Sequence, residues 1–294
     1  MTELLASTTA LMDRAGVAQG GLAHAESGMH FLRFEAPSPL QAAVYHPLLC
    51  LVLQGAKQVN AGAHSLTVNS GQSLIVSHAL PIVSRITNAT HDTPYMALVF
   101  PLDPDLLRGL ANAVPLAQGV RNHDPFSIRL CPTDPVMEET LTRYLDQCAG
   151  DETRQLLAPI TRQEIHARLL LGPHADVLQK LLWQETTASR IFQATREIQS
   201  DLSRRLVVRE LADRVGMSNS TFFEHFKAVT GTSPLQYQKD LRLLNARDAL
   251  HRTSTKVSEI AFRMGYESSA QFSREYARKF GLSPRQDRAA LAVK

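Results

Sequence analysis

The sequence predicts an α+β protein of two domains, in which a small N-terminal β-barrel with added helices precedes an all-α C-terminal domain. Its 294 residues are enough for two domains, each with its own core. Short apolar runs separated by turn residues occupy the region from about 29 to 100. The segment 210–234 recurs as 259–284, so the last third of the chain contains an internal repeat.

The apolar runs between 29 and 100 have the length and composition of β-strands. They are MHFLRF, LLCLVL, SLTV, SLIV, PIVSRI and YMALVF. The separators at 60–64 (NAGAH) and 69–73 (NSGQS) contain residues typical of hairpins and loops. Closely spaced strands of this kind favour a small barrel or jelly roll, which closes its sheet edges and can hold a ligand inside.

From Pro104 onward the pattern changes to that of helices. Apolar periodicity predicts helices in DLLRGLANAV and PVMEETLTRYLDQC, followed by a pair at 159–171 and 174–185. We place the link between the domains near 186–190, where ETTASR interrupts the helical pattern.

The repeat aligns at an offset of 49, which becomes 50 after one inserted residue. The identical pairs are Glu210 with Glu259, Ala212 with Ala261, Arg214 with Arg263, Gly216 with Gly265, Ser218 with Ser268, Phe222 with Phe272, Gly231 with Gly281, Ser233 with Ser283 and Pro234 with Pro284. Two copies are too few for a solenoid, because such arrays need more units to bury a continuous core. A duplicated helix-turn-helix, at about 206–230 and 256–280, is the better interpretation.

The apolar spacing explains why each copy should be two helices joined by a tight turn. One buried face is formed by Val208, Leu211, Ala212 and Val215, and its repeat by Val257, Ile260, Ala261 and Met264. Gly216 and Gly265 should end these first helices, and Ser218 and Ser268 should cap the second helices. In the second helices the aromatic residues spaced four apart should face inward. They are Phe222 and Phe226 in one copy, and Phe272, Tyr276 and Phe280 in the other.

The outward positions of the two second helices are the candidate DNA contacts, because a helix in the major groove reads base edges with its first turns. They are Asn219, Ser220, Phe223, Glu224 and Lys227 in the first copy, and Ser269, Ala270, Ser273, Arg274 and Arg278 in the second. Arg274 is the strongest base-contact candidate, since arginine pairs with guanine through a bidentate contact. The alternative roles for Arg274 are a contact to a phosphate or no contact to DNA at all, as a solvated surface side chain. Glu224 is unfavourable beside phosphates, although it can accept a hydrogen bond from cytosine.

Charge separates the two halves of the chain. Residues 190–294 carry 19 Lys and Arg against 11 Asp and Glu, a net charge of +8, whereas residues 1–189 carry −5. A basic face attracts the phosphate backbone and releases counterions, so affinity should fall with salt. Charge alone also fits a merely soluble surface, but together with the repeat it indicates nucleic-acid binding.

These residues carry a resemblance to a known family. The segment from about 189 to 290 resembles the DNA-binding domain of AraC/XylS-type transcription regulators, in which two helix-turn-helix units are joined by one long helix, here 233–252. The most specific match is GYESSAQFSREYARKFGLSP at 265–284. Glu224 departs from the family pattern, which often has a basic or amide residue there. The segment 46–81 also resembles the cupin-like N-terminal domain of one group of these regulators.

The resemblance implies a sequence-specific transcription regulator, and activation is among its expected roles. It further implies that a small-molecule effector bound within the barrel controls this regulator. It also implies that the helices after the barrel form a homodimer interface. We expect Lys57, His78 and Arg85 to contact the effector within an apolar lining. The alternative for each of the three is an ordinary strand or rim residue.

The sequence contains no recognised catalytic or metal motif. The N-terminal histidines lack the closely spaced HxH and following carboxylate of cupin metal sites, so we predict no metal; they are His46, His64, His78 and His91. Cys50, Cys131 and Cys148 lack CxxC spacing, which argues against a disulfide framework or structural zinc. GxSxG, HExxH and GxxxxGK[ST] do not occur in a suitable context, so we predict no enzyme and no cofactor. Two rival interpretations stay open: a cupin-type metal enzyme with a nucleic-acid-binding appendage, and an effector-independent architectural DNA binder.

The predicted domains are 1–188, a cupin-like effector-sensing domain with dimerisation helices, and 189–294, a DNA-binding domain. No run of 18 apolar residues and no signal-peptide pattern occurs, so we expect a cytoplasmic protein without a membrane partner. Expected partners are double-stranded DNA, RNA polymerase, an unidentified small-molecule effector and a second copy of the chain.

Overall fold

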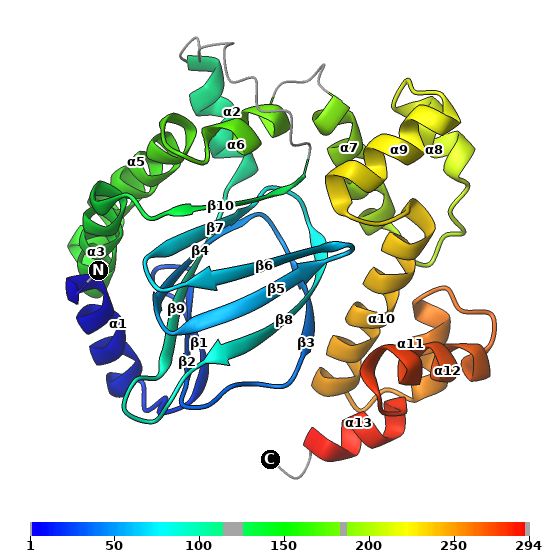
Figure 1. Cartoon of the computed structure of the whole chain (residues 1–294), viewed down its shortest axis with the longest axis horizontal. Helices are drawn as coiled ribbons and strands as arrows, with labels where there is room; N and C mark the ends of the chain where they lie inside the picture. Colours follow the sequence, from blue (N-terminus) through cyan, green and yellow to red (C-terminus); the bar gives the residue numbers. More distant parts are fainter. Residues whose placement is uncertain (1, 114–125, 183–186, 292–294) are drawn as a thin grey trace.

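The structure is a computed structural model that describes residues 2–113, 126–182 and 187–291. A β-rich N-terminal part is followed by a helical C-terminal part, which confirms the predicted α+β class (Figure 1). The strands are β1 (Gly20–His24), β2 (Met29–Phe34), β3 (Gln41–Tyr45), β4 (Leu48–Gln54), β5 (Ala56–Ala61), β6 (His64–Asn69), β7 (Gln72–Val76), β8 (Leu80–Asn88), β9 (Tyr95–Pro101) and β10 (Ile128–Pro132).

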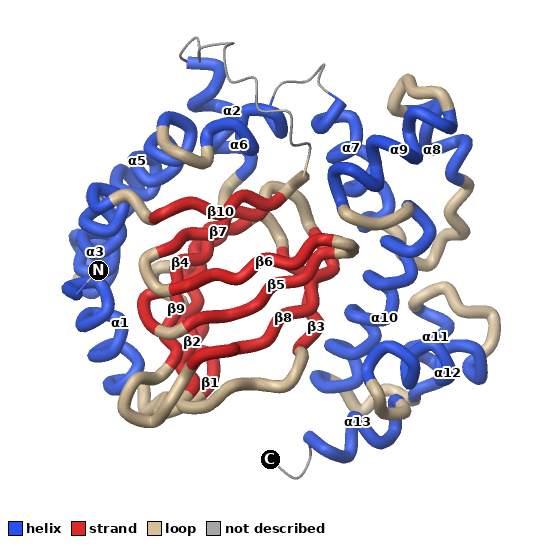
Figure 2. The backbone as a smooth tube through the Cα atoms, in the orientation of Figure 1, coloured by secondary structure: helices blue, strands red, loops and turns tan. Residues whose placement is uncertain are grey.

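Helices cover one side of the barrel and form the whole C-terminal part (Figure 2). Those of the N-terminal part are α1 (Thr2–Arg14), α2 (Pro104–Ala113), α3 (Pro135–Ala149), α4 (Asp151–Leu156), α5 (Ala158–Leu171) and α6 (Ala175–Leu182). Those of the C-terminal part are α7 (Thr187–Ser200), α8 (Val208–Arg214), α9 (Asn219–Thr230), α10 (Pro234–Arg252), α11 (Val257–Arg263), α12 (Ser269–Phe280) and α13 (Pro284–Leu291).

Two antiparallel sheets form the barrel in the described part of the chain. One has the strand order β1-β2-β9-β4-β7-β10, and the other has the order β3-β8-β5-β6. All six apolar runs of the sequence lie on strands, whereas β1, β3, β5 and β10 were not expected. Strands that face each other across a closed sandwich leave few exposed edges and enclose a common interior.

The central strand β4 is buried on both faces, which explains why its sequence is a continuous apolar run. Cys50 and Val52 face the barrel interior. Leu49, Leu51 and Leu53 face the opposite way and pack against helices. The covering helices are α1, α3 and α5, which lie on the outer side of the larger sheet, away from the C-terminal part (Figure 1).

The barrel interior and the first helix-turn-helix unit share one apolar core. Interior residues such as Val59 and Ile82 belong to the same buried cluster as Phe222 and Phe226 of α9 and Leu241 of α10. The second unit has a separate core built from α10, α11 and α12, which includes Ile260, Phe272 and Tyr276. Although the two units are copies in sequence, the buried cluster of the barrel, among the residues that the structure describes, includes side chains of the first unit and none of α11 or α12.

Hydrogen bonds add to this shared core at three places. The Tyr237 hydroxyl of α10 donates to the Ala79 carbonyl over 2.5 Å. The backbone N–H and the hydroxyl of Ser127 both donate to the Val229 carbonyl at the end of α9, over 3.1 and 2.7 Å. At the hairpin between β5 and β6 the Ala63 N–H donates to the Gly231 carbonyl over 3.4 Å, and the two segments approach so closely that a Cβ on Gly62 would lie 2.0 Å from the Gly231 carbonyl oxygen.

The predicted link between the domains lies partly on a helix. We placed it near 186–190, but α7 already begins at Thr187. Ser189 and Ile191 are buried, and burial of this first turn stabilises helix where the sequence pattern alone shows an interruption. The predicted helix 174–185 corresponds to α6, and its residues 183–185 lie outside the described ones.

Candidate nucleic-acid interface

The two candidate recognition helices begin and end on the signals that the sequence predicts. The Ser218 hydroxyl accepts a hydrogen bond from the Thr221 N–H, and the Ser268 hydroxyl accepts one from the Gln271 N–H, each over 3.3 Å. Each hydroxyl satisfies a backbone donor that the helix itself leaves free. Gly231 ends α9 and Gly281 ends α12, both in the left-handed conformation.

The inward faces of α9 and α12 are aromatic, as predicted. Phe222, Phe226, Phe272 and Tyr276 are fully buried, and Phe280 is half-buried. Neighbouring rings on each helix pack at centroid distances of 5.5 Å, which fixes the rotation of the helix about its axis. The opposite face of each helix therefore has to point outward.

All ten predicted contact residues lie on the outward or flanking faces of α9 and α12. Ser269 and Ser273 are half-buried, and the Ser273 hydroxyl donates to the Ser269 carbonyl over 2.8 Å. The other eight are exposed: Asn219, Ser220, Phe223, Glu224, Lys227, Ala270, Arg274 and Arg278. Among the described residues, Lys227, Arg274 and Arg278 form no ion pair with an acidic side chain. These cations are free to meet an anionic partner.

Ion pairs hold α12 against the long helix α10. Lys239 lies 3.0 Å from Glu275, and Lys279 lies 2.5 Å from Asp240. The pKa of Glu275 is lowered, because hydrogen bonds from Lys239, Gln271 and Tyr266 outweigh the burial that would raise it. Sequence analysis missed these residues, since their partners lie far apart along the chain.

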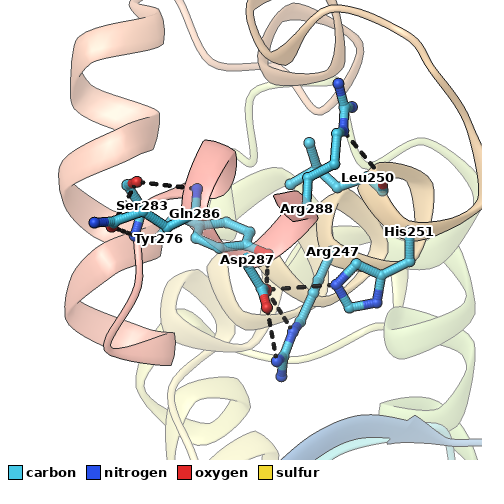
Figure 3. Close-up of polar contacts among 8 residues, drawn as sticks. All are labelled: Arg247, Leu250, His251, Tyr276, Ser283, Gln286, Asp287 and Arg288. Atoms are coloured by element: carbon cyan, nitrogen blue, oxygen red, sulfur yellow. Dashed lines mark hydrogen bonds and ion pairs between the residues drawn. The ribbon is translucent and has the colours of Figure 1, made fainter. Parts of the chain in front are cut away.

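A buried carboxylate joins α10, α12 and α13 (Figure 3). Asp287 accepts hydrogen bonds from the Tyr276 hydroxyl over 2.6 Å and from Arg247 over 2.8 and 3.3 Å. His251 lies 3.5 Å away. Burial alone would raise the pKa of Asp287, but the hydrogen bonds from Tyr276 and Arg247 outweigh it and lower the pKa. The cluster thus links three helices that surround the second unit's core.

Arg242 ties the turn of the second unit to the loop that precedes the first. Its guanidinium donates to the carbonyls of Leu202, Arg204 and Gly265 over 2.6 to 3.4 Å. Gly265 has φ +78°, and a Cβ there would lie 2.3 Å from the Ser203 carbonyl oxygen, so glycine is required both for conformation and for space. An open groove of about 960 Å³, lined by the loop before α8, by α10 and by the second unit, lies at this contact.

The three candidate effector residues are not brought together. Lys57 lies inside the barrel, 4% exposed, where its ammonium donates to Cys50 Sγ over 3.2 Å. His78 is buried at the barrel end, packed edge-on against Phe192 of α7 at a centroid distance of 5.1 Å. Arg85 is exposed on the outer face of the smaller sheet, where it donates to Gln58. An interior ligand could meet Lys57 but not Arg85.

The surroundings of Lys57 shift its pKa upward in spite of its burial. Desolvation lowers its pKa, but Cys50, Tyr45 and Tyr95 together raise it well above the usual value. Within the described residues no carboxylate pairs with it. A buried ammonium without an acidic partner is costly, so this position is a candidate for meeting an anion.

The histidines and cysteines do not gather into a metal centre. The described residues contain no group of three or more His, Cys, Asp or Glu that could hold a metal ion. His64 stacks on Phe126, and His91 pairs with Glu35 on the surface. The three cysteines, all in described segments, are free and buried. No helix of the described residues is both long and apolar enough to cross a membrane.

Comparison with known families decides between the interpretations. The model of the N-terminus of AraC-type transcriptional regulators matches residues 25–177, which is more than half of the chain. The chain belongs to the AraC-type transcriptional regulators. A helix-turn-helix domain model matches residues 211–290 of this AraC-type regulator. Both matches favour a regulator over a cupin-type enzyme.

Curated relatives of this AraC-type regulator are HTH-type regulators. CdhR of Pseudomonas aeruginosa is 28% identical over 150 residues, which are 51% of this chain and 45% of CdhR. The activator RhaS of Escherichia fergusonii is 29% identical over 187 residues, which are 63% of this chain and 66% of RhaS. The chain thus spans about half to two thirds of the length of these relatives.

The solved structure of ToxT from Vibrio cholerae has a similar fold. It superposes with a TM-score of 0.60 over 88% of this chain and 97% of ToxT, at 10% sequence identity. The likeness concerns the fold of both parts, the β-rich domain and the helical domain.

The hydrogen bonds of Asp287 give a test of what stabilises the second unit. We expect Asp287→Asn to lower the free energy of unfolding by about 3 kcal/mol, because the Arg247 cation would lose its buried counter-charge. Asp248→Asn is the control, since Asp248 is exposed and its one ion pair within the described residues is with Arg252. Urea denaturation of both variants measures the difference.

The effect of Asp287→Asn depends on pH. A lowered pKa means that the carboxylate stabilises the fold above its unfolded pKa of about 4, and that this stability is lost as pH falls through the folded pKa. The gap between wild type and Asp287→Asn should therefore shrink below about pH 4. A gap that stays constant down to acid denaturation would contradict the role of the carboxylate.

Proposed function

We propose that this AraC-type regulator controls transcription by binding double-stranded DNA through α9 and α12, with α12 as the principal reader of sequence. The observation that carries the proposal is the exposed row of Ala270, Arg274 and Arg278 on a helix whose opposite face is fixed by buried aromatic rings. Arg274 has no acidic partner among the described residues and can reach guanine in the major groove.

The first unit is the weaker reader. At the repeat offset of 50, Glu224 stands where the second unit has Arg274, and Phe223 stands where it has Ser273. Both side chains are exposed on α9. A carboxylate beside the phosphates is repelled, so α9 contributes fewer favourable contacts per base pair.

We propose further that an anionic effector acts from the barrel, with Lys57 as its counter-charge. ToxT has been crystallised with an unsaturated fatty acid and with a butenoic acid derivative, both of which are carboxylic acids. In this chain the interior around Lys57 is filled by apolar side chains such as Val59 and Ile82. A ligand that enters has to displace them, and they belong to the core that also supports α9 and α10. Effector binding would thus change the placement of the first unit directly.

A second copy of the chain and RNA polymerase are the further partners that we expect of a regulator of this family. Sedimentation equilibrium of the full chain, alone and with duplex DNA, measures whether it dimerises.

Binding of wild type and Arg274→Ala to the DNA upstream of the regulator's own gene, and to an unrelated duplex, tests the reading role of α12. We expect the variant to lose about 1 to 3 kcal/mol on the upstream DNA and little on the unrelated duplex. Arg263→Ala is the control, since Arg263 is exposed on α11 and paired with Glu259. An equal loss on both duplexes would show that Arg274 contacts phosphate instead of a base.

Oleate, a carboxylate with an apolar tail, tests the effector proposal. We expect it to change the DNA affinity of wild type and of Arg85→Met but not of Lys57→Met, because only Lys57 lies inside the barrel. Lys57→Met should itself fold stably, since it removes a buried charge without an acidic partner. A response of Lys57→Met equal to that of wild type would remove Lys57 from the site, and no response of wild type would exclude fatty carboxylates as the effector class.

A further inference from the structure

The recognition helix of the second unit is flanked on both sides by hollows in the surface. Ala270, Arg274 and Arg278 mark its outward face, at spacings of four residues. On one side Ser269 and Ser273 line a cavity of about 440 Å³. On the other side Gln271 and Glu275 line the groove of about 960 Å³ between the second unit and α10.

A helix that enters the major groove has one phosphate backbone on each side. The groove is about 12 Å wide and a helix with its side chains is about 10 to 12 Å across, so the flanks of the helix come close to both backbones. When α12 reads bases, the 440 Å³ cavity and the larger groove therefore face the two strands of the duplex.

The two hollows differ in charge. The smaller cavity is lined by Lys256, Arg285 and Arg288, together with serine hydroxyls and no acidic residue. The larger groove contains Glu267 and Glu275 besides its basic residues. The smaller cavity therefore combines cations and small hydroxyl donors without a carboxylate to repel an anion, which is the chemistry that a phosphodiester requires, whereas the larger groove places Glu267 and Glu275 beside its cations.

The cations of the smaller cavity differ in their role. Arg288 donates to the Leu250 and Thr255 carbonyls over 3.2 and 2.6 Å, so it holds the cavity wall in place. Lys256 and Arg285 are exposed and, within the described residues, form no ion pair. They remain available for a ligand.

The repeat supplies an internal comparison. Lys256 caps α11 and Arg285 lies in the first turn of α13; their counterparts in the first unit are Val207, which caps α8, and Leu235, in the first turn of α10. Val207 and Leu235 are 44% and 55% exposed, so the same positions reach the surface in both units. The fold does not demand cations there, and the second unit alone carries them.

We propose that Lys256 and Arg285 form a phosphate clamp that anchors the second unit on the DNA backbone beside the bases that α12 reads. The inference rests on the proposed DNA binding and assigns the anchoring contacts to one of the two units. Because the clamp touches phosphates, it raises affinity for every sequence and does not contribute to the choice between sequences.

The test is a salt series with the full-length chain on the upstream duplex and on an unrelated duplex. We expect the double variant Lys256→Ala/Arg285→Ala to lose affinity by the same factor on both duplexes, and the slope of log affinity against log salt to fall by about 2. The matched control is Arg252→Ala/Arg263→Ala, which removes the same charge from the same unit at residues paired with Asp248 and Glu259. Its slope should remain close to that of wild type.

Three results would overturn the clamp: an unchanged slope, a loss confined to the upstream duplex, or an equal fall in slope for the control. Thermal melting of both double variants shows whether the second unit remains folded. The single variant Arg285→Lys keeps the positive charge, so its slope of log affinity against log salt should stay close to that of wild type. If wild type binds neither duplex, DNA binding by the chain as proposed fails, which is distinct from failure of the clamp.

Discussion

The continuous apolar core that joins the barrel interior to α9 and α10 is the constraint on which the rest of the structure depends. Phe222 and Phe226 complete this core, and the Val229 carbonyl and the Tyr237 hydroxyl fasten its rim to the barrel. Apolar burial stabilises by about 25 cal/mol per Å², so separation of the first unit from the barrel would lose the apolar burial that the two parts share. The position of α9 is therefore set by the state of the barrel.

The second unit is attached differently. Its apolar core, built from α10, α11 and α12, is separate from that of the barrel, and ion pairs and hydrogen bonds around Asp287, Glu275 and Arg242 add to it. Polar contacts of this kind fix orientation more than they add stability. In the proposed DNA complex, Arg274 on the outer face and Lys256 and Arg285 at the flank would anchor the second unit, while the first unit, which carries Glu224, is the one whose placement would respond to the barrel. On this proposal, duplication has produced one unit suited to anchoring and one suited to control.

Much of this arrangement follows from sequence, because the relevant signals are local. The spacing of Phe272 and Tyr276 and the caps at Ser268 and Gly281 determine α12 and its outward face. Strand β5 was missed because its inward row begins with Lys57, a charged residue in a position where the pattern of alternation requires an apolar one. The contacts of Asp287 and Glu275 and the fusion of α9 to the barrel could not be predicted, since both copies of the repeat have the same inward aromatic pattern and only tertiary packing distinguishes them.

Native-state hydrogen exchange in dilute urea tests the unequal attachment of the two units most directly, because amides that open together report one cooperative region. If the first unit shares its core with the barrel, the amides of α9 near Phe226 open with the same free energy and urea dependence as those of β4 and β7. The amides of α12 near Tyr276 then open separately, with a smaller urea dependence. If α9 and α12 open together and apart from the barrel, the C-terminal part is one independent domain and the account is wrong.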